Sequence, residues 1–270
     1  MINTHLIASE VKVNFKNLMI WTGVVVAFTV LIMAFFPSIQ MAGDDLTALL
    51  DSLPEGLLKG MGMDEFMMTT GLGFYRVYYG IYIIIIMGVY CFSTGAGIFT
   101  KEEAKHTIEF IMSKPISRLE YFFSKSISAF VLYFLLVLIQ AIIALLAITW
   151  LDTETIDISR FVALHMHGAA LLFFFMALGI VSSVVINPTM NFMGLGVGLV
   201  FGTYLIDALA QSSTDLEWIG YISPFYYTDF NVTDAGYQFN AISTSIFFLL
   251  GLGLTILASR LFLRRDFLTL

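Results

Sequence analysis

The sequence predicts an all-α membrane protein with six transmembrane helices and a cytosolic amphipathic helix between the second and third. The 270 residues are 59% hydrophobic and 12% charged, with a mean hydropathy of +0.88. A soluble domain carries about twice that share of charge. Apolar runs long enough to cross a bilayer recur along the chain, and the charged residues gather between them. We therefore expect one transmembrane domain over residues 1–270.

The first predicted span, Leu18–Phe36, contains no charged residue and is ended by Pro37. It is longer than the apolar part of a cleaved signal peptide, so we expect it to be retained. Residues 1–17 are weakly amphipathic and fit either a surface helix or a frayed lead-in. The remaining spans are expected at 77–99, 126–151, 161–186, 192–210 and 241–263.

Two long connections are expected on the outer side. The segment 37–76 is rich in Asp and Glu, and its leucines predict short amphipathic helices. The segment 211–240 has no Lys or Arg, and aromatic residues surround Pro224. That composition suits a loop that dips back into the membrane interface.

The basic residues predict the orientation. Ten of the thirteen Lys and Arg residues fall on the side of both termini, and five of them lie in the segment Thr100–Lys125, which we call the elbow. The positive-inside rule therefore places both termini and the elbow in the cytosol. The net charge of −7 disfavours nucleic acid as a partner, and the single Cys91 excludes a disulfide within the chain.

The elbow contains two helix-start patterns. Thr100 with Glu103, and Ser117 with Glu120, both fit a capping box. Pro115 lies between them and disfavours helix at the residue before it. We therefore expect a helix, a tight turn and a second helix that continues into the third span.

The first elbow helix is expected to be amphipathic. Its apolar residues recur at helical spacing, and its other side is charged. The apolar set is Ala104, Ile108, Ile111 and Met112, and the charged set includes Glu102, Lys105 and Glu109.

Catalysis by Glu102 and Glu103 is disfavoured. The paired-glutamate motif of intramembrane proteases needs an arginine four residues after the second glutamate, where this chain has Thr107. Carboxylates at a helix start favour the helix dipole instead, or a partner surface. The chain also lacks a G-x-x-x-x-G-K-[ST] loop, so nucleotide binding of that kind must come from another subunit.

Three further features are candidates. Asp207 is the acidic residue deepest in a predicted span, which fits either substrate contact or snorkelling to the interface. His165 and His167 are two residues apart, so on a helix they diverge, and packing is a better interpretation than a metal site. Gly194, Gly198 and Gly202 form one smooth face for packing against another span, which we slightly favour, or against a second copy.

The chain resembles the permease subunit of bacterial type-2 ABC exporters, among them exporters of antimicrobial and cytolytic peptides. The resemblance rests on Leu53–Leu58 (LPEGLL), on Ile222–Phe225 (ISPF) and on the elbow. The elbow is similar to the pattern E-E-x-x-x-T-x-E-x-x-x-x-x-P-[IV]-S-R, whose helix docks in a cleft of the ATPase. The loop between the fourth and fifth spans lacks the basic residues that relatives often carry there.

The resemblance implies a half-transporter without catalytic residues or bound cofactor of its own. Two permease copies, expected to form a homodimer in membrane lipid, would work with two ATPase subunits that hold ATP and Mg. The implied coupling residues are Glu102, Glu103, Lys105, Thr107, Glu109, Met112, Pro115, Ser117 and Arg118. Amphipathic peptides are the expected cargo. A drug, ion or lipid-linked glycan permease stays open, as does a gradient-driven transporter without an ATPase.

Overall fold

The computed structural model describes residues 2–42, 52, 56, 58, 70–105, 107, 108, 113, 115–152, 156–234 and 236–265. The regular structure within these residues is helical, and they contain no strand. The helices are α1 (Thr4–Met41), α5 (Gly71–Tyr78), the π-helix η1 (Tyr79–Ile83), α6 (Ile84–Ala104), α8 (Arg118–Leu151), α9 (Ile158–Val185), α10 (Phe192–Ser212), η2 (Thr214–Leu216), α11 (Glu217–Gly220), η3 (Phe225–Tyr227) and α12 (Ala241–Arg264). With α5, η1 and α6 taken as one, six stretches of the described chain are long and apolar enough to span a membrane. The predicted fold class and number of spans are confirmed.

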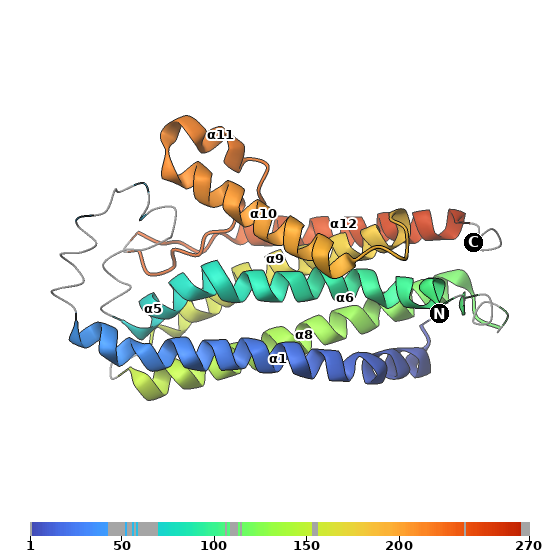
Figure 1. Cartoon of the computed structure of the whole chain (residues 1–270), viewed down its shortest axis with the longest axis horizontal. Helices are drawn as coiled ribbons and strands as arrows, with labels where there is room; N and C mark the ends of the chain where they lie inside the picture. Colours follow the sequence, from blue (N-terminus) through green and yellow to red (C-terminus); the bar gives the residue numbers. More distant parts are fainter. Residues whose placement is uncertain are drawn as a thin grey trace.

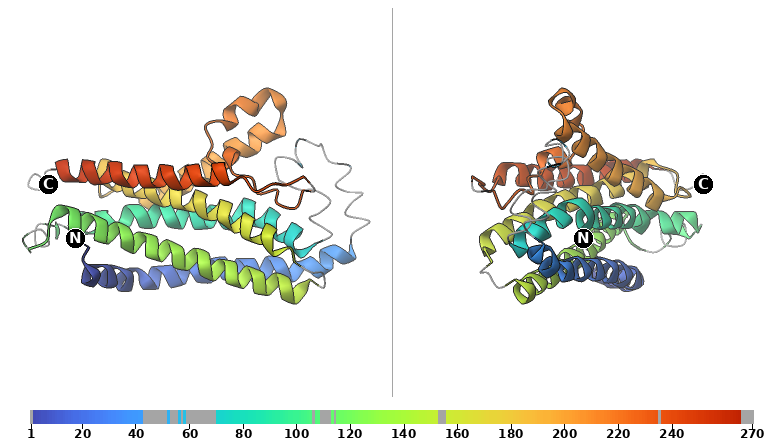
Figure 2. Two further views of the ribbon diagram at one scale, coloured as in Figure 1. Left: turned by 180° about the vertical axis from the view of Figure 1, so that it is seen from behind. Right: turned by 60° about the vertical axis from the view of Figure 1, so that its left-hand side comes forward.

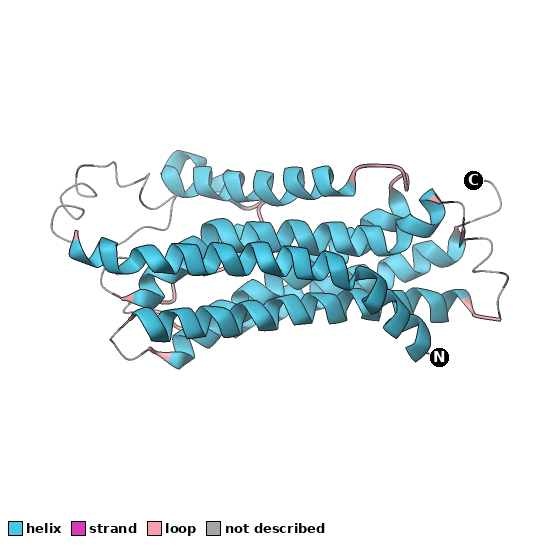
Figure 3. Cartoon of the chain, turned by 60° about the horizontal axis from the view of Figure 1, so that its bottom comes forward, coloured by secondary structure: helices cyan, strands magenta, loops and turns pink. Residues whose placement is uncertain are grey.

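The long helices lie side by side along the long axis of the molecule, and both termini lie at one end (Figure 1). We call this end the terminal end and the opposite one the distal end. α6 packs against α9 and α10, α9 also packs against α12, and α1 packs against α8. Figure 2 shows α12 and α1 at opposite edges of the bundle, and Figure 3 shows the described part of the chain as helices with connecting loops and no strand.

The first helix is longer than predicted. It begins at Thr4, where the side chain of Asn3 accepts a hydrogen bond from the Leu6 amide at 3.1 Å. The residues before Leu18 therefore continue the span as one helix. Pro37 lies inside α1, so the prediction that it ends the helix is wrong. Its ring removes one backbone hydrogen bond, and the helix continues for only about one more turn.

The second span also exceeds its predicted limits. The Thr70 hydroxyl caps its start by accepting from the Gly73 amide at 3.0 Å, and the helix runs through η1 to Ala104. Arg76, which we had placed in the outer loop, is a buried residue of α5. A π-helix inserts a wide turn into a helix and is frequent at functional sites.

The distal connection 211–240 is partly helical. After α10 the chain turns through η2 and α11, which project from the bundle in Figure 1, and then returns along α10. The Ser223 hydroxyl donates to the Thr203 carbonyl at 2.7 Å and fixes this return. That the segment enters the membrane interface stays a prediction.

Two glycines allow α6 and α9 to approach closely at the centre of the bundle. A Cβ on Gly179 of α9 would lie 2.1 Å from the Phe92 carbonyl oxygen. A Cβ on Gly95 of α6 would lie 2.4 Å from the Met176 carbonyl oxygen. Since neither backbone can move without separating the helices, both positions require glycine.

We expect Gly179→Ala to destabilise the bundle by about 1–3 kcal/mol through overpacking. Gly97→Ala is the matched control, because a Cβ there meets no described atom within 4 Å. Heating the purified protein and following its size-exclusion peak measures the difference. Equal melting temperatures for the two variants would contradict the close-approach argument.

Candidate functional site

The elbow connects α6 to α8 at the terminal end. Ser117 caps α8 by accepting from the Glu120 amide at 3.1 Å, as its pattern predicted. The predicted cap at Thr100 is wrong, because this residue lies inside α6 and its hydroxyl donates to the Ala96 carbonyl at 3.0 Å. Threonine bonds in this way inside a continuing helix, so the span runs on through the position where we expected a new start.

Only part of the predicted amphipathic helix falls within the described residues. Glu109 and Met112 lie outside them. Ile108 is buried, and the Thr107 amide donates to the Glu102 carbonyl at 2.9 Å. The existence of an amphipathic helix over the whole segment therefore stays a prediction.

A buried ammonium group lies where α1, α6 and α8 meet. Lys125 of α8 has a fully buried side chain, and its Nζ lies 2.6 Å from Glu102 Oε2 and 3.3 Å from Glu10 Oε1. The same Nζ donates to the Ile98 carbonyl at 2.6 Å. Two carboxylates thus form ion pairs with this ammonium group, and one backbone carbonyl accepts a hydrogen bond from it. Glu10 and Glu102 are also paired with Lys101.

A second ion pair attaches the end of α12. Arg265 Nη1 lies 3.0 Å from Glu103 Oε2, and it also donates to the Ser183 carbonyl of α9 at 3.4 Å. Arg118, at the start of α8, donates to the Leu263 and Arg265 carbonyls. We call the group Glu10, Lys101, Glu102, Glu103, Lys125 and Arg265 the ion network. Its three carboxylates and three cations connect α1, α6, α8 and the end of α12.

The ion network divides the predicted coupling residues into two sets. Glu102 and Glu103 are 9% and 5% exposed, so they face the bundle and not the surrounding solution. The resemblance implies that these carboxylates face the ATPase. In the structure they point into the bundle instead. The described members on the surface are Lys105, Thr107, Pro115, Ser117 and Arg118. We call these five residues the elbow surface.

Comparison with protein families decides what kind of protein carries this arrangement. The model of the ABC-2 family transporter protein matches residues 5–267. The chain belongs to the ABC-2 transporter family. It is a multi-pass membrane subunit of an ABC transporter, and its ATPase is a partner. Comparison with curated proteins gives no significant match.

In this ABC-2 permease, the histidines near the distal end have protein partners. His165 contacts the Tyr75 hydroxyl at 3.2 Å and the Phe161 carbonyl at 2.9 Å. His167 contacts the Tyr237 hydroxyl and Thr244 Oγ1, both at 2.8 Å. Within the described residues, no group of three potential ligands lies close enough to hold a metal.

The glycine face of α10 does not pack within the permease. A Cβ on Gly198 or Gly202 would meet no described atom within 4 Å, and a Cβ on Gly194 would meet only its neighbour Asn191. The structure therefore does not support our preference for packing against another span. The second alternative, a contact with another copy, is considered below.

Four members of the ion network were not predicted as functional residues from the sequence, namely Glu10, Lys101, Lys125 and Arg265. Glu10 lies in a segment whose pattern did not separate a surface helix from a lead-in. Lys125 counted as one of several basic residues of the elbow. The sequence did contain one signal for these residues, namely a charged side chain next to a span and flanked by apolar residues. Such a group needs a partner when it is buried.

Removing one partner should destabilise the permease strongly. We expect Lys125→Met to cost about 3–5 kcal/mol, because Glu10 and Glu102 lose their buried cation and keep only the partly exposed Lys101 as a partner. Lys105→Met, at an exposed position, is the control and should melt like the parent. Thermal unfolding of the purified permease measures both.

The double variant Lys125→Met/Glu102→Gln extends the experiment. It removes one positive and one negative charge, so it should recover part of the lost stability if the two groups interact. Additive losses would show that the 2.6 Å contact has no energetic weight.

Proposed function

We propose that this ABC-2 permease exports amphipathic peptides as a half-transporter, with the elbow surface docked on its ATPase. The ion network carries the proposal. Docking moves the elbow, and the network joins the elbow to three spans and to the end of α12. Because buried ion pairs resist separation, movement of the elbow displaces these helices together.

The arrangement gives different roles to the residues that the resemblance implied. Lys105, Thr107, Pro115, Ser117 and Arg118 make the contact with the ATPase, together with Glu109 and Met112. Glu102 and Glu103 transmit the movement from inside the bundle. ATP and Mg bind to the two ATPase subunits, in the cytosol of a bacterial cell, where both permease termini also lie.

Chemical cross-linking tests the docking surface. A cysteine at exposed Ser117 should cross-link to a cysteine in the ATPase cleft within the assembled complex. Trp150→Cys is the control, because Trp150 is 88% exposed and lies at the distal end of α8. The native Cys91 is buried and does not compete. Equal cross-linking at both positions, or cross-linking at Trp150 alone, would contradict the docking and the orientation.

A second permease copy is proposed to pack on the glycine face of α10. Among the six spans of the described chain, α10 has the smallest fraction of buried residues in its most apolar part. Its glycines allow another backbone to approach closely. An isologous homodimer would bring this face of α10 onto itself.

We expect Gly198→Leu to reduce the dimer fraction in detergent or nanodiscs, since a leucine side chain separates the two backbones. Gly253→Leu on α12 is matched, because a Cβ there also meets no described atom within 4 Å. Cross-linking yield or mass photometry gives the fraction of dimer. An unchanged fraction in Gly198→Leu would exclude this face as the interface.

Peptide cargo is distinguished from the alternatives by turnover of the reconstituted complex. Amphipathic peptides should stimulate ATP hydrolysis in wild type, and Glu103→Gln should weaken that stimulation without separating the subunits. Stimulation by a drug or lipid-linked glycan alone would favour those cargoes. Transport in liposomes without the ATPase would favour a gradient-driven mechanism.

A further inference from the structure

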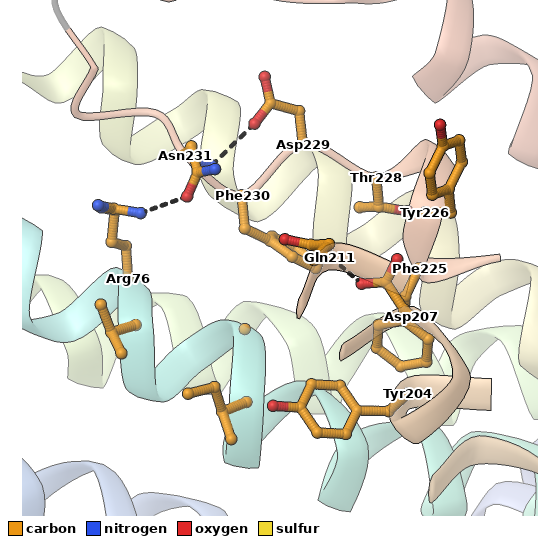
Figure 4. A pocket seen from close by; sticks show the side chains of 13 residues that line it. Arg76, Tyr204, Asp207, Gln211, Phe225, Tyr226, Thr228, Asp229, Phe230 and Asn231 are labelled. Atoms are coloured by element: carbon orange, nitrogen blue, oxygen red, sulfur yellow. Dashed lines mark hydrogen bonds between the residues drawn. The ribbon is translucent and has the colours of Figure 1, made fainter. Parts of the chain in front are cut away.

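A cavity lies in the distal half of the bundle, away from the ion network. Its volume is about 290 Å³, and it lies between the α5–η1 junction, the distal part of α10 and residues 225–231. Figure 4 shows Arg76, Asn231 and Asp229 on one side and Asp207, Gln211 and Tyr204 on the other. The volume is close to the lower limit for ligand pockets, so the cavity suits a group as large as one side chain and not a whole peptide.

The Asp207 carboxylate lines this cavity with half of its hydrogen-bonding capacity unused. The side chain is 6% exposed, and Oδ2 accepts from Gln211 Nε2 at 2.7 Å. The buried Oδ1 has no hydrogen-bond partner among the described residues. An unsatisfied buried carboxylate oxygen is costly, and a donor that enters the cavity would remove that cost.

The charges around the cavity favour a cation as that donor. Among the described residues of the lining, Arg76 is the one basic residue, and its Nη1 already donates to Asn231 Oδ1 at 2.6 Å. Asp229 adds a second carboxylate, whose Oδ1 accepts a hydrogen bond from the backbone amide of Asn231 at 2.9 Å. With two carboxylates and one guanidinium, the part of the lining that the structure describes has a net negative charge. A negative cavity attracts cations and repels anions.

The remaining lining is suited to the apolar body of an organic cation. Tyr204, Phe225, Tyr226 and Phe230 supply aromatic rings, whose faces attract ammonium groups. Gly80 and Ile81 come from the π-helix η1, the type of helix irregularity that is frequent at binding sites. A bare metal ion would not use these apolar surfaces.

We propose that this cavity binds the ammonium group of an organic cation, with Asp207 as its counter-ion. The inference rests on the proposed transport function, because it makes the cavity a holding site for the charged part of a cargo. The ammonium group donates to Asp207 Oδ1, and its apolar neighbours contact the aromatic rings. The source of the group is either a lysine side chain of a peptide or a small lipophilic amine.

Binding to the full-length permease in nanodiscs, without ATPase or nucleotide, tests the site separately from transport. Isothermal titration with phenethylammonium should show binding, and 2-phenylethanol, which lacks the charge, should bind at least about tenfold more weakly. Asp207→Asn should reduce the affinity for phenethylammonium by about tenfold or more, and the exposed Asp229→Asn should reduce it less. Asp215→Asn, outside the cavity, should leave it unchanged.

Competition identifies the source of the ammonium group. Displacement of phenethylammonium by a lysine-containing amphipathic peptide, but not by its N-acetyl-lysine counterpart, would indicate peptide. Failure of both peptides to compete would indicate a small amine.

Two results would overturn the site. One is equal affinity of wild type for phenethylammonium and 2-phenylethanol, a comparison that does not depend on the folding of any variant. The other is unchanged affinity in a folded Asp207→Asn permease. If the wild-type complex binds phenethylammonium but shows no ATP-driven peptide transport, only the transport proposal is contradicted.

Discussion

The fold at the terminal end depends on one constraint, the burial of the Lys125 ammonium group. An ammonium group inside an apolar bundle must be surrounded by acceptors, and here Glu10, Glu102 and the Ile98 carbonyl supply them. These acceptors come from α1 and α6, while the lysine comes from α8. Three helices are therefore held in one relative position by the requirement to satisfy one charge.

This constraint explains why the sequence predicted the fold class but not the ion pairs inside the bundle. The six apolar runs, the Ser117 cap and the continuous third span follow from local patterns, and the structure agrees with them. Thr100 and Pro37 were misread because α6 and α1 continue through them. Partners far apart in the chain, such as Glu10 and Lys101, cannot be found from spacing. The same holds for Asp207, whose environment is completed by residues 225–231.

Burial also changes the meaning of the acidic pair at the elbow. A surface glutamate contributes to a partner interface mainly by long-range attraction, which salt screens. Glu102 and Glu103 are instead paired with Lys125 of α8 and with Arg265 after α12, so in the proposed docking they would act on the partner mechanically. In the proposed docking, the exposed Lys105 and Thr107 would make the contact, and the buried ion pairs next to them would hold the elbow to the bundle.

A single helical stretch connects the two sites of the molecule. Gly71–Ala104 carries Glu102 at one end and Arg76 and Gly80 near the other, a length of about 50 Å at helical rise. A continuous helix transmits axial displacement, and π-helical turns are frequent at functional sites. Since η1 contributes directly to the cavity, the ion network and the cavity lining are joined by one continuous helical stretch. In the proposed exporter, this continuity provides a physical route by which ATPase closure alters the site of the cargo's charge.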